Sequence, residues 1–207
     1  KIFLKNNIKT PKFFSIKKSK FSTTEILKII KKKRIKFPIV SKPINEGSSL
    51  GVKVCRNKKR LFTSIKLLFK KYEELIFEEY IGGQEIQVAV INGKALGAIE
   101  LIPKRLFYDY KAKYTKKART QHVMPANLTA KKYNEVLKIA KKTHKVLGCR
   151  GVTRSDFKFC NNIFYLLELN TQPGMTSLSL VPEIANYTGL SFENLVEKIL
   201  LDASINR

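Results

Sequence analysis

Two short segments near the end of the chain carry acidic and amide side chains at the spacing of a cation site. Glu168 and Asn170 lie two residues apart at the end of an apolar run that starts at Leu166. In a β-strand, residues two apart point to the same face, so we expect both side chains on one surface. A turn at Pro173 and Gly174 follows. Carboxylate and amide oxygens suit a hard cation and the phosphates that it carries, so this segment predicts a metal–phosphate site.

A third candidate ligand, Asp156, precedes Glu168 in a strand-like run that also holds Arg154 on the same face. The two runs form a predicted hairpin around residues 161–162. Asp156 lies opposite Glu168 only if that hairpin has a three-residue loop or a bulge. A plain two-residue loop pairs Asp156 with Leu167, on the other face. With the first register, Asp156 joins the other two ligands in one magnesium-sized site beside Arg154.

The alternative is that these carboxylates are ordinary solvated residues at strand ends. Taken singly, each of them favours that interpretation. Each one, however, is embedded in an apolar run, where an unpaired charge would be costly. The joint pattern therefore favours a cation site.

The formal net charge of +25 indicates either a polyanion partner or a compositional bias. The cations are mostly Lys and are spread along the whole chain, whereas Arg is favoured for bidentate recognition of phosphate. Abundant Lys beside Ile and Asn favours the compositional explanation, so we predict no specific nucleic-acid partner. Weak, salt-sensitive binding to polyanions is expected in either case.

The 207 residues suffice for one large domain or two small ones. No apolar run approaches the ~18 residues that span a membrane, so no membrane partner is predicted. The first residues lack the pattern of a signal peptide. Three cysteines without metal-type spacing are expected to be reduced thiols. Together these features predict a cytoplasmic protein.

Short strands, hairpins and helices alternate along the chain, which predicts an α+β fold. Capping residues Ser22, Thr129 and Ser191 mark the starts of three helices, and a fourth is predicted over 61–71. Strands are predicted over 12–16, 37–41, 52–55, 75–80, 84–91 and 95–101, with a hairpin at residues 92–93. The polar segment 108–119 is predicted to be a surface loop.

A loop of small residues at 46–51 follows the strand that ends at Lys42. Its backbone amides and the hydroxyls of Ser48 and Ser49 could fold over phosphate oxygens. The loop leads into a strand and not a helix, so it is not a P-loop. Lys42 could place its charge on a phosphate, with a snorkelling surface Lys as the alternative.

Residues 78–81 end a strand whose backbone could hydrogen-bond a flat heterocycle. Glu85, at the start of the next strand, could accept hydrogen bonds from ribose hydroxyls. His144 lies on the apolar face of a predicted helix, and His122 has no evident partner. No nucleophile–base arrangement is apparent, so nucleophilic catalysis by the protein is not predicted.

Five motifs, in this order along nearly the whole chain, resemble the D-alanine–D-alanine ligase family of the ATP-grasp superfamily. They are Lys42 with 46–49, and then 78–81, 108–114, 154–156 and 168–176. The resemblance implies the ATP-grasp fold, in which two α+β subdomains with antiparallel sheets clasp the nucleotide. The subdomain over 1–80 would carry the lid, and the one over 81–207 the metal and substrate site.

The resemblance also implies a role for each matching residue. The ATP contacts would be Lys42, Glu46, Ser48, Ser49, Glu78, Tyr80, Ile81, Glu85 and Lys113. Two Mg²⁺ ions, replaceable by Mn²⁺, would be held by Asp156, Glu168 and Asn170. The catalytic groups would be Arg154 and the Gly174 amide, as an oxyanion hole, with Lys113 on the phosphates. The second-substrate pocket would be formed by Tyr114, Ser179 and Leu180.

The implied activity is the ATP-dependent ligation of two D-alanines through an acyl phosphate, for peptidoglycan precursor synthesis, by an enzyme that is a homodimer when intact. The family carries a further N-terminal α/β domain, which this sequence lacks. The chain is therefore expected to be the ATP- and Mg²⁺-binding portion and to be inactive alone, with a separate chain as a possible source of the missing domain. The alternatives are a basic polyanion-binding module and a non-functional remnant of the same fold.

Overall fold

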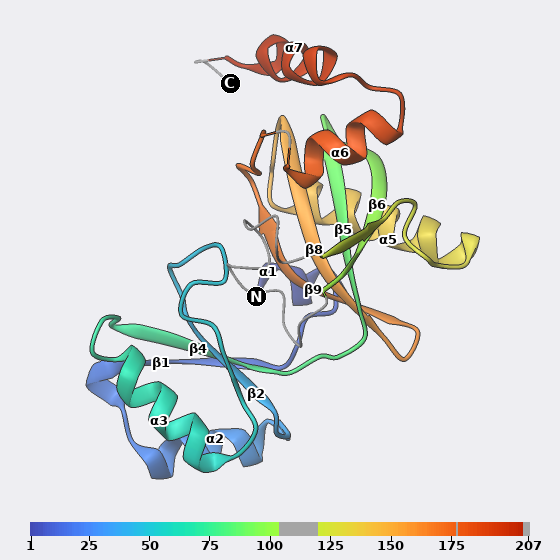
Figure 1. The fold of residues 1–207 in the computed structure, drawn as a ribbon. Coiled ribbons are helices and arrows are strands. Elements are labelled where there is room, and N and C mark those ends of the chain that lie inside the picture. Colours follow the sequence, from blue (N-terminus) through green and yellow to red (C-terminus); the bar gives the residue numbers. More distant parts are fainter. Residues whose placement is uncertain (104–119, 177, 205–207) are drawn as a thin grey trace. The chain divides into compact units, whose positions relative to one another are not determined.

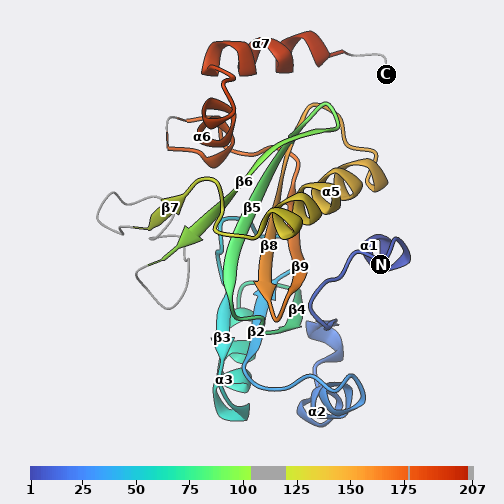
Figure 2. The same cartoon turned by 90° about the vertical axis from the view of Figure 1, so that its right-hand side faces the viewer.

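The structure is a computed structural model that describes residues 1–103, 120–176 and 178–204. The chain divides into two compact units, whose elements are drawn in Figures 1 and 2. The four-stranded unit comprises Pro11–Ile81, and the five-stranded unit combines Lys1–Thr10, Gly82–Ile102 and the chain from Thr120 onward. Each unit contains helices beside an antiparallel sheet, so the predicted α+β class is confirmed.

The four-stranded unit has the strand order β1-β4-β2-β3, and all neighbouring strands are antiparallel. The strands are β1 (Phe13–Lys17), β2 (Ile39–Pro43), β3 (Lys53–Cys55) and β4 (Glu74–Glu79), and the helices are η1 (Lys18–Lys20), α2 (Thr23–Lys32) and α3 (Lys58–Leu68). The side chain of Ser22 caps α2 as predicted, by accepting from the Glu25 N–H. Asn57 caps α3 in the same way, so this helix starts before the predicted Leu61.

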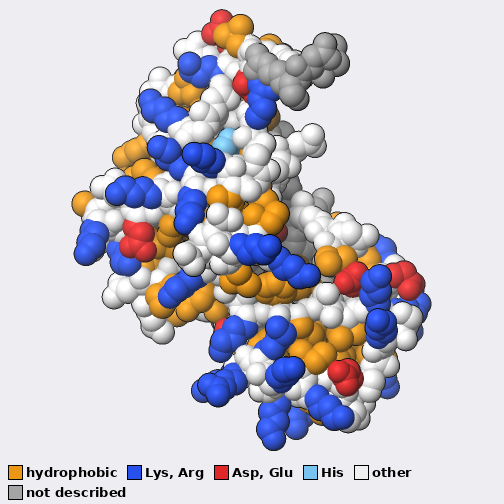
Figure 3. All heavy atoms as spheres, turned by 180° about the vertical axis from the view of Figure 1, so that it is seen from behind, with side chains coloured by type: hydrophobic (Ala, Val, Ile, Leu, Met, Phe, Trp, Pro, Cys, Tyr) orange, Lys and Arg blue, Asp and Glu red, His pale blue; other side chains and the backbone are white. Residues whose placement is uncertain are grey.

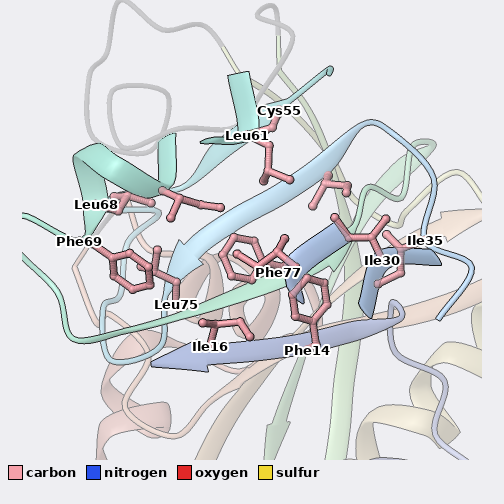
Figure 4. Packing of buried hydrophobic residues seen from close by; sticks show 13 residues of the cluster. Phe14, Ile16, Ile30, Ile35, Cys55, Leu61, Leu68, Phe69, Leu75 and Phe77 are labelled. Carbon is pink, nitrogen blue, oxygen red and sulfur yellow. The ribbon is translucent and has the colours of Figure 1, made fainter. Parts of the chain in front are cut away.

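One face of this sheet forms the core of the unit. Phe14, Leu75 and Phe77 project from the strands toward helix residues such as Leu61 and Ile30, as Figure 4 shows. Side chains alternate along a strand, so the neighbouring positions of β2 and β4 lie on the opposite face. This second face carries Lys42 and Glu78, two residues that the sequence predicts to contact ATP.

The five-stranded unit has the strand order β7-β6-β5-β8-β9, again antiparallel throughout. The strands are β5 (Gln84–Ile91), β6 (Lys94–Ile102), β7 (Gln121–Val123), β8 (Val152–Cys160) and β9 (Ile163–Asn170), and the helices are α1 (Ile2–Lys5), α5 (Ala130–Val146), α6 (Leu180–Tyr187) and α7 (Phe192–Asp202). Thr129 and Ser191 cap α5 and α7 as predicted. Helix α6 is an addition to the sequence-based expectation.

Helices α5 and α6 pack on opposite faces of this sheet (Figure 2). Val136 and Ala140 of α5 lie in a buried cluster with Val88, Phe157 and Leu166 of the strands. Helix α6 contacts β5 and β6. The strand positions that alternate with the α5-facing cluster therefore face the α6 side.

The first ten residues belong to the five-stranded unit. Ile8 is buried in the cluster under α5, and the N–H of Leu166 donates to the carbonyl of Lys9 at 2.8 Å. The division into functional subdomains at 1–80 and 81–207 stays a prediction. Within the described ranges, every helix falls short of the length and apolar character that a membrane crossing requires.

Substitution of Phe77 tests the core of the four-stranded unit. Phe77 is fully buried and stacks on Phe14, with ring centroids 5.0 Å apart. We expect Phe77→Ala to lower the free energy of unfolding by about 3–5 kcal/mol because it leaves a cavity. Leu67→Ala is the matched control, since Leu67 is 56% exposed on α3, and it should change stability by less than about 0.5 kcal/mol. Urea denaturation measures both, and equal effects would contradict this packing.

His144 makes stability depend on pH. It is buried between α5 and β8, where its Nδ1 lies 2.9 Å from the Thr153 hydroxyl. Desolvation by burial lowers the pKa of His144 below its ordinary 6.5. The unfolded chain therefore binds the proton more readily, and the stability from neutral His144 is complete above pH 6.5 and lost as the pH falls through the folded pKa.

We expect the free energy of unfolding to decrease between pH 7 and pH 5. Part of this decrease should disappear in His144→Gln, which cannot be protonated. Denaturant titrations at several pH values give the slope for both proteins. An identical slope in the variant would exclude His144 as its source.

Candidate active site

The pairing of β8 with β9 brings the predicted metal ligands together. Asp156 lies opposite Glu168, and Arg154 lies opposite Asn170. The connecting turn has only two residues, 161 and 162, both with positive φ, as a tight hairpin turn requires. A bulge at Asp156/Phe157 shifts the register and leaves Leu167 without a cross-strand partner. The bulge that the sequence requires for this site is therefore confirmed.

The bulge also reverses the faces within β9. Leu166 is buried in the cluster under α5, whereas Glu168 pairs with Asp156 on the other face. In a regular strand, with Leu167 paired like its neighbours, Leu166 and Glu168 would point the same way. The bulge thus lets one strand supply both a core residue and a metal-ligand candidate.

Arg154 and Asp156 form a bidentate ion pair. The distances are 2.7 Å from Nε to Oδ1 and 2.9 Å from Nη2 to Oδ2. Both side chains are largely shielded from solvent, so the guanidinium offsets the cost of burying the carboxylate. The pair fixes the plane of both groups on the α6-side face.

Asn170 and Ser179 shape the loop that follows β9. The Asn170 side-chain oxygen accepts a hydrogen bond from the Gln172 N–H at 3.0 Å. The Ser179 hydroxyl accepts from the Thr176 N–H at 3.0 Å. It also lies so close to Gly174 that an added Cβ would come within 2.8 Å of it. Gly174 is therefore needed for close packing between this loop and the start of α6.

The donor set fits Mg²⁺. Two carboxylates and one carboxamide lie on the same face of adjacent strands. Across the described residues, no group of three or more His, Cys, Asp or Glu side chains could hold a metal. Mg²⁺ is usually bound through one or two carboxylates, with water and substrate phosphates completing its shell. Asp156, Glu168 and Asn170 match that pattern.

Glu85, predicted to bind ribose, forms an ion pair across the same sheet. Its carboxylate lies 2.9 Å from the ammonium of Lys158, directly opposite on β8. Leu180, predicted to shape the second-substrate pocket, is the first residue of α6 and is buried.

In the four-stranded unit, Lys42 is paired with Glu78 at 2.8 Å. Both belong to the sheet face that is turned away from α2 and α3. Lys42 is mostly shielded and has a buried carboxylate as its partner. Tyr80 and Ile81 follow β4 and are half-buried.

The loop after β2 is tightly bent. Ser48 and Ser49 both have positive φ and are half-buried, whereas Glu46 is exposed. Gly51 lies so close to Pro43 that an added Cβ would come within 2.8 Å of its ring. Two predicted site residues, Lys113 and Tyr114, lie outside the described residues.

The structure adds a polar pair that sequence reasoning missed. His122 on β7 lies 2.7 Å from the carboxylate of Glu183 on α6, although the sequence offers it no evident partner. The pair could not be found from spacing, because α6 is not predicted and the two residues are far apart in the chain.

Comparison with known proteins places the chain in a family. A family model described as the D-Ala D-Ala ligase C-terminus matches residues 2–201. The chain is 56% identical to the D-alanine–D-alanine ligase of Pelagibacter ubique, with 100% of this chain and 67% of that protein covered. It is 44% identical to the ligase of Geotalea uraniireducens over 81% of this chain and 54% of that protein.

A solved structure shows the same architecture. The D-alanine–D-alanine ligase of Bacillus anthracis, complexed with ATP, matches with a TM-score of 0.80 at 30% identity, over 97% of this chain and 63% of that chain. The chain thus spans between about half and two thirds of the length of these relatives. The predicted ATP-grasp fold is confirmed, and the chain belongs to the D-alanine–D-alanine ligase family.

Proposed function

We propose that this chain binds Mg-ATP and is the nucleotide- and metal-binding portion of an enzyme that ligates two D-alanines. The observation that carries the proposal is the convergence of Asp156, Glu168 and Asn170 on one face of the β8–β9 hairpin. The matches to D-alanine–D-alanine ligases support the substrate assignment. We also propose the subdomain division at 1–80 and 81–207, and a homodimer for the complete enzyme.

The reaction needs no protein nucleophile. The carboxylate of one D-alanine attacks the γ-phosphorus of ATP, and ADP leaves. The amine of the second D-alanine attacks the acyl phosphate carbonyl, loses a proton and expels phosphate. Bound Mg²⁺ would neutralise charge on the phosphoryl oxygens.

The chain's own residues would orient and stabilise the reacting groups. Asp156 holds the guanidinium of Arg154 in one plane, and an oriented cation with the Gly174 amide can stabilise an oxyanion. Lys42 would bind phosphate, with Glu78 setting its position. Lys113 on the phosphates and Tyr114 in the second-substrate pocket remain part of the proposal.

The remaining assignments follow the same logic. The loop with Glu46, Ser48 and Ser49 would cover the triphosphate, while the strand end at Tyr80 and Ile81 would hold adenine. Glu85 would bind ribose, and Ser179 with Leu180 would border the second-substrate pocket. These 207 residues match only part of each relative's length. We therefore propose that alone they bind nucleotide without forming dipeptide.

The competing function, polyanion binding, would use basic residues that lie apart from the predicted metal ligands. Lys and Arg side chains are spread widely over the face seen in Figure 3. A pocket of about 650 Å³ at the end of α5 is lined by cations that include Lys141, Lys142, Lys145 and Arg150. None of the predicted site residues that the structure describes lines this pocket. Loss of a metal ligand would therefore leave polyanion binding intact.

Calorimetry with Mg-ATP tests the proposal. We expect Glu168→Gln to weaken Mg-ATP binding by about tenfold or more, while ATP binding in EDTA stays equal or becomes tighter because a carboxylate repels triphosphate. Glu197→Gln on α7 is the control, since it makes the same charge change at an exposed position. Absence of wild-type binding at millimolar nucleotide, or equal effects of the two variants, would refute the proposal. Dipeptide formation by the isolated chain would refute its predicted inactivity.

Two single-residue deletions test the register of the site. Leu167 is the unpaired residue of the bulge, so its deletion should leave Asp156 opposite Glu168 and retain Mn²⁺ binding. Deletion of Leu169 moves Asn170 to the other face and should weaken Mn²⁺ binding by about tenfold. Electron paramagnetic resonance of Mn²⁺ gives both affinities, and the reverse order would contradict the observed pairing.

A further inference from the structure

Gln87 lies in the same cross-strand row as the two metal-ligand carboxylates. On β5 it is directly opposite Asp156 of β8, which is in turn opposite Glu168 of β9. Its other cross-strand neighbour is Ile99 of β6. Side chains directly opposite each other in a sheet are close enough to contact. Gln87, Asp156 and Glu168 therefore form a row of polar side chains across three strands on the α6-side face, and Gln87 is the member next to the apolar Ile99.

Gln87 is buried without full hydrogen bonding. Its side chain is 1% exposed, and within the described part of the chain its Oε1 has no hydrogen-bond partner. Neither cross-strand neighbour can donate to it, because Ile99 is apolar and an ionised Asp156 only accepts. Leaving a buried acceptor unsatisfied is destabilising, because the group loses its hydrogen bond to water without gaining another. An apolar side chain of similar length would fill this position without that cost.

A buried carboxamide beside a metal-ligand carboxylate has two useful groups. Its N–H can donate to the carboxylate and set its direction, as outer-shell partners of metal ligands do. Its oxygen needs a donor, and burial keeps bulk solvent away from it. Mg²⁺ keeps several bound waters, which would bring such a donor to this row together with the ion.

We propose that Gln87 is a positioning residue for the divalent cation, an inference that rests on the proposed function. Its carboxamide N–H holds Asp156, and its Oε1 accepts a hydrogen bond from a water molecule bound to the cation. The unsatisfied oxygen of the metal-free protein is then the acceptor that the loaded site uses.

Gln87→Met removes both groups and keeps the length of the side chain. The matched control is Gln84→Met on the same strand, because the Gln84 amide donates instead to Glu100 at 3.0 Å and to the Asn127 carbonyl at 3.1 Å. Two quantities are measured for each protein. They are the Mn²⁺ affinity in the presence of ATP, by paramagnetic resonance, and the thermal midpoint without metal.

The two variants are expected to behave in opposite ways. Gln87→Met should weaken Mn²⁺ binding by about tenfold or more and leave the metal-free midpoint unchanged or higher, since an unsatisfied acceptor is gone. Gln84→Met should lower the midpoint and leave Mn²⁺ affinity unchanged. ATP affinity in EDTA should be the same in all three proteins. Gln87→Leu replaces Gln87→Met should the latter not fold.

Each other result overturns the inference in a recognisable way. Wild-type Mn²⁺ affinity in Gln87→Met, with a lowered midpoint, would assign Gln87 a purely structural role. Equal losses of Mn²⁺ affinity in the Gln87 and Gln84 variants would point to general damage to β5. If the wild-type chain itself fails to bind Mn²⁺ with ATP, the proposed function fails first, independently of Gln87.

Discussion

The antiparallel pairing of β8 with β9 determines where the polar groups of the five-stranded unit lie. A single unpaired residue, Leu167, sends Leu166 into the core and Glu168 to the opposite face. Because side chains alternate with a period of two, a shift by one residue would exchange those faces. The core under α5 and the candidate metal site therefore depend on the same ladder of hydrogen bonds.

Ion pairs that are largely shielded from solvent recur among the predicted ligand contacts of each unit. Arg154 with Asp156 and Lys158 with Glu85 lie on the five-stranded sheet, and Lys42 with Glu78 lies on the four-stranded sheet. Burying such pairs brings little or no net stability compared with apolar residues. Each pair contains at least one predicted ligand contact, and ligand binding is the role that we propose for them. The unsatisfied oxygen of Gln87 fits the same view, because it too costs stability in the absence of a ligand.

Much of the local structure follows from short-range signals. Ser22, Thr129 and Ser191 accept the hydrogen bonds that their capping positions predict, and the turn at residues 92–93 joins β5 and β6. Helix α6 has no comparable signal, because Ser179 makes no side-chain cap to its helix. It has only eight residues, with Pro182 near the start. Its apolar side chains favour a helix here because they pack on β5 and β6.

The amino-acid sequence by itself identified the family and predicted the oxygen ligands and the phosphate-type loop, because these depend on residue types and on their order along the chain. Only the tertiary structure decided between the two hairpin registers, paired Lys42 with Glu78 and brought Gln87 beside Asp156. Partners in adjacent strands are distant in sequence. The stability of a bulge depends on how well the side chains on both faces of the sheet pack around it. Local secondary-structure propensity does not include these packing energies, so these contacts could not be predicted from the sequence.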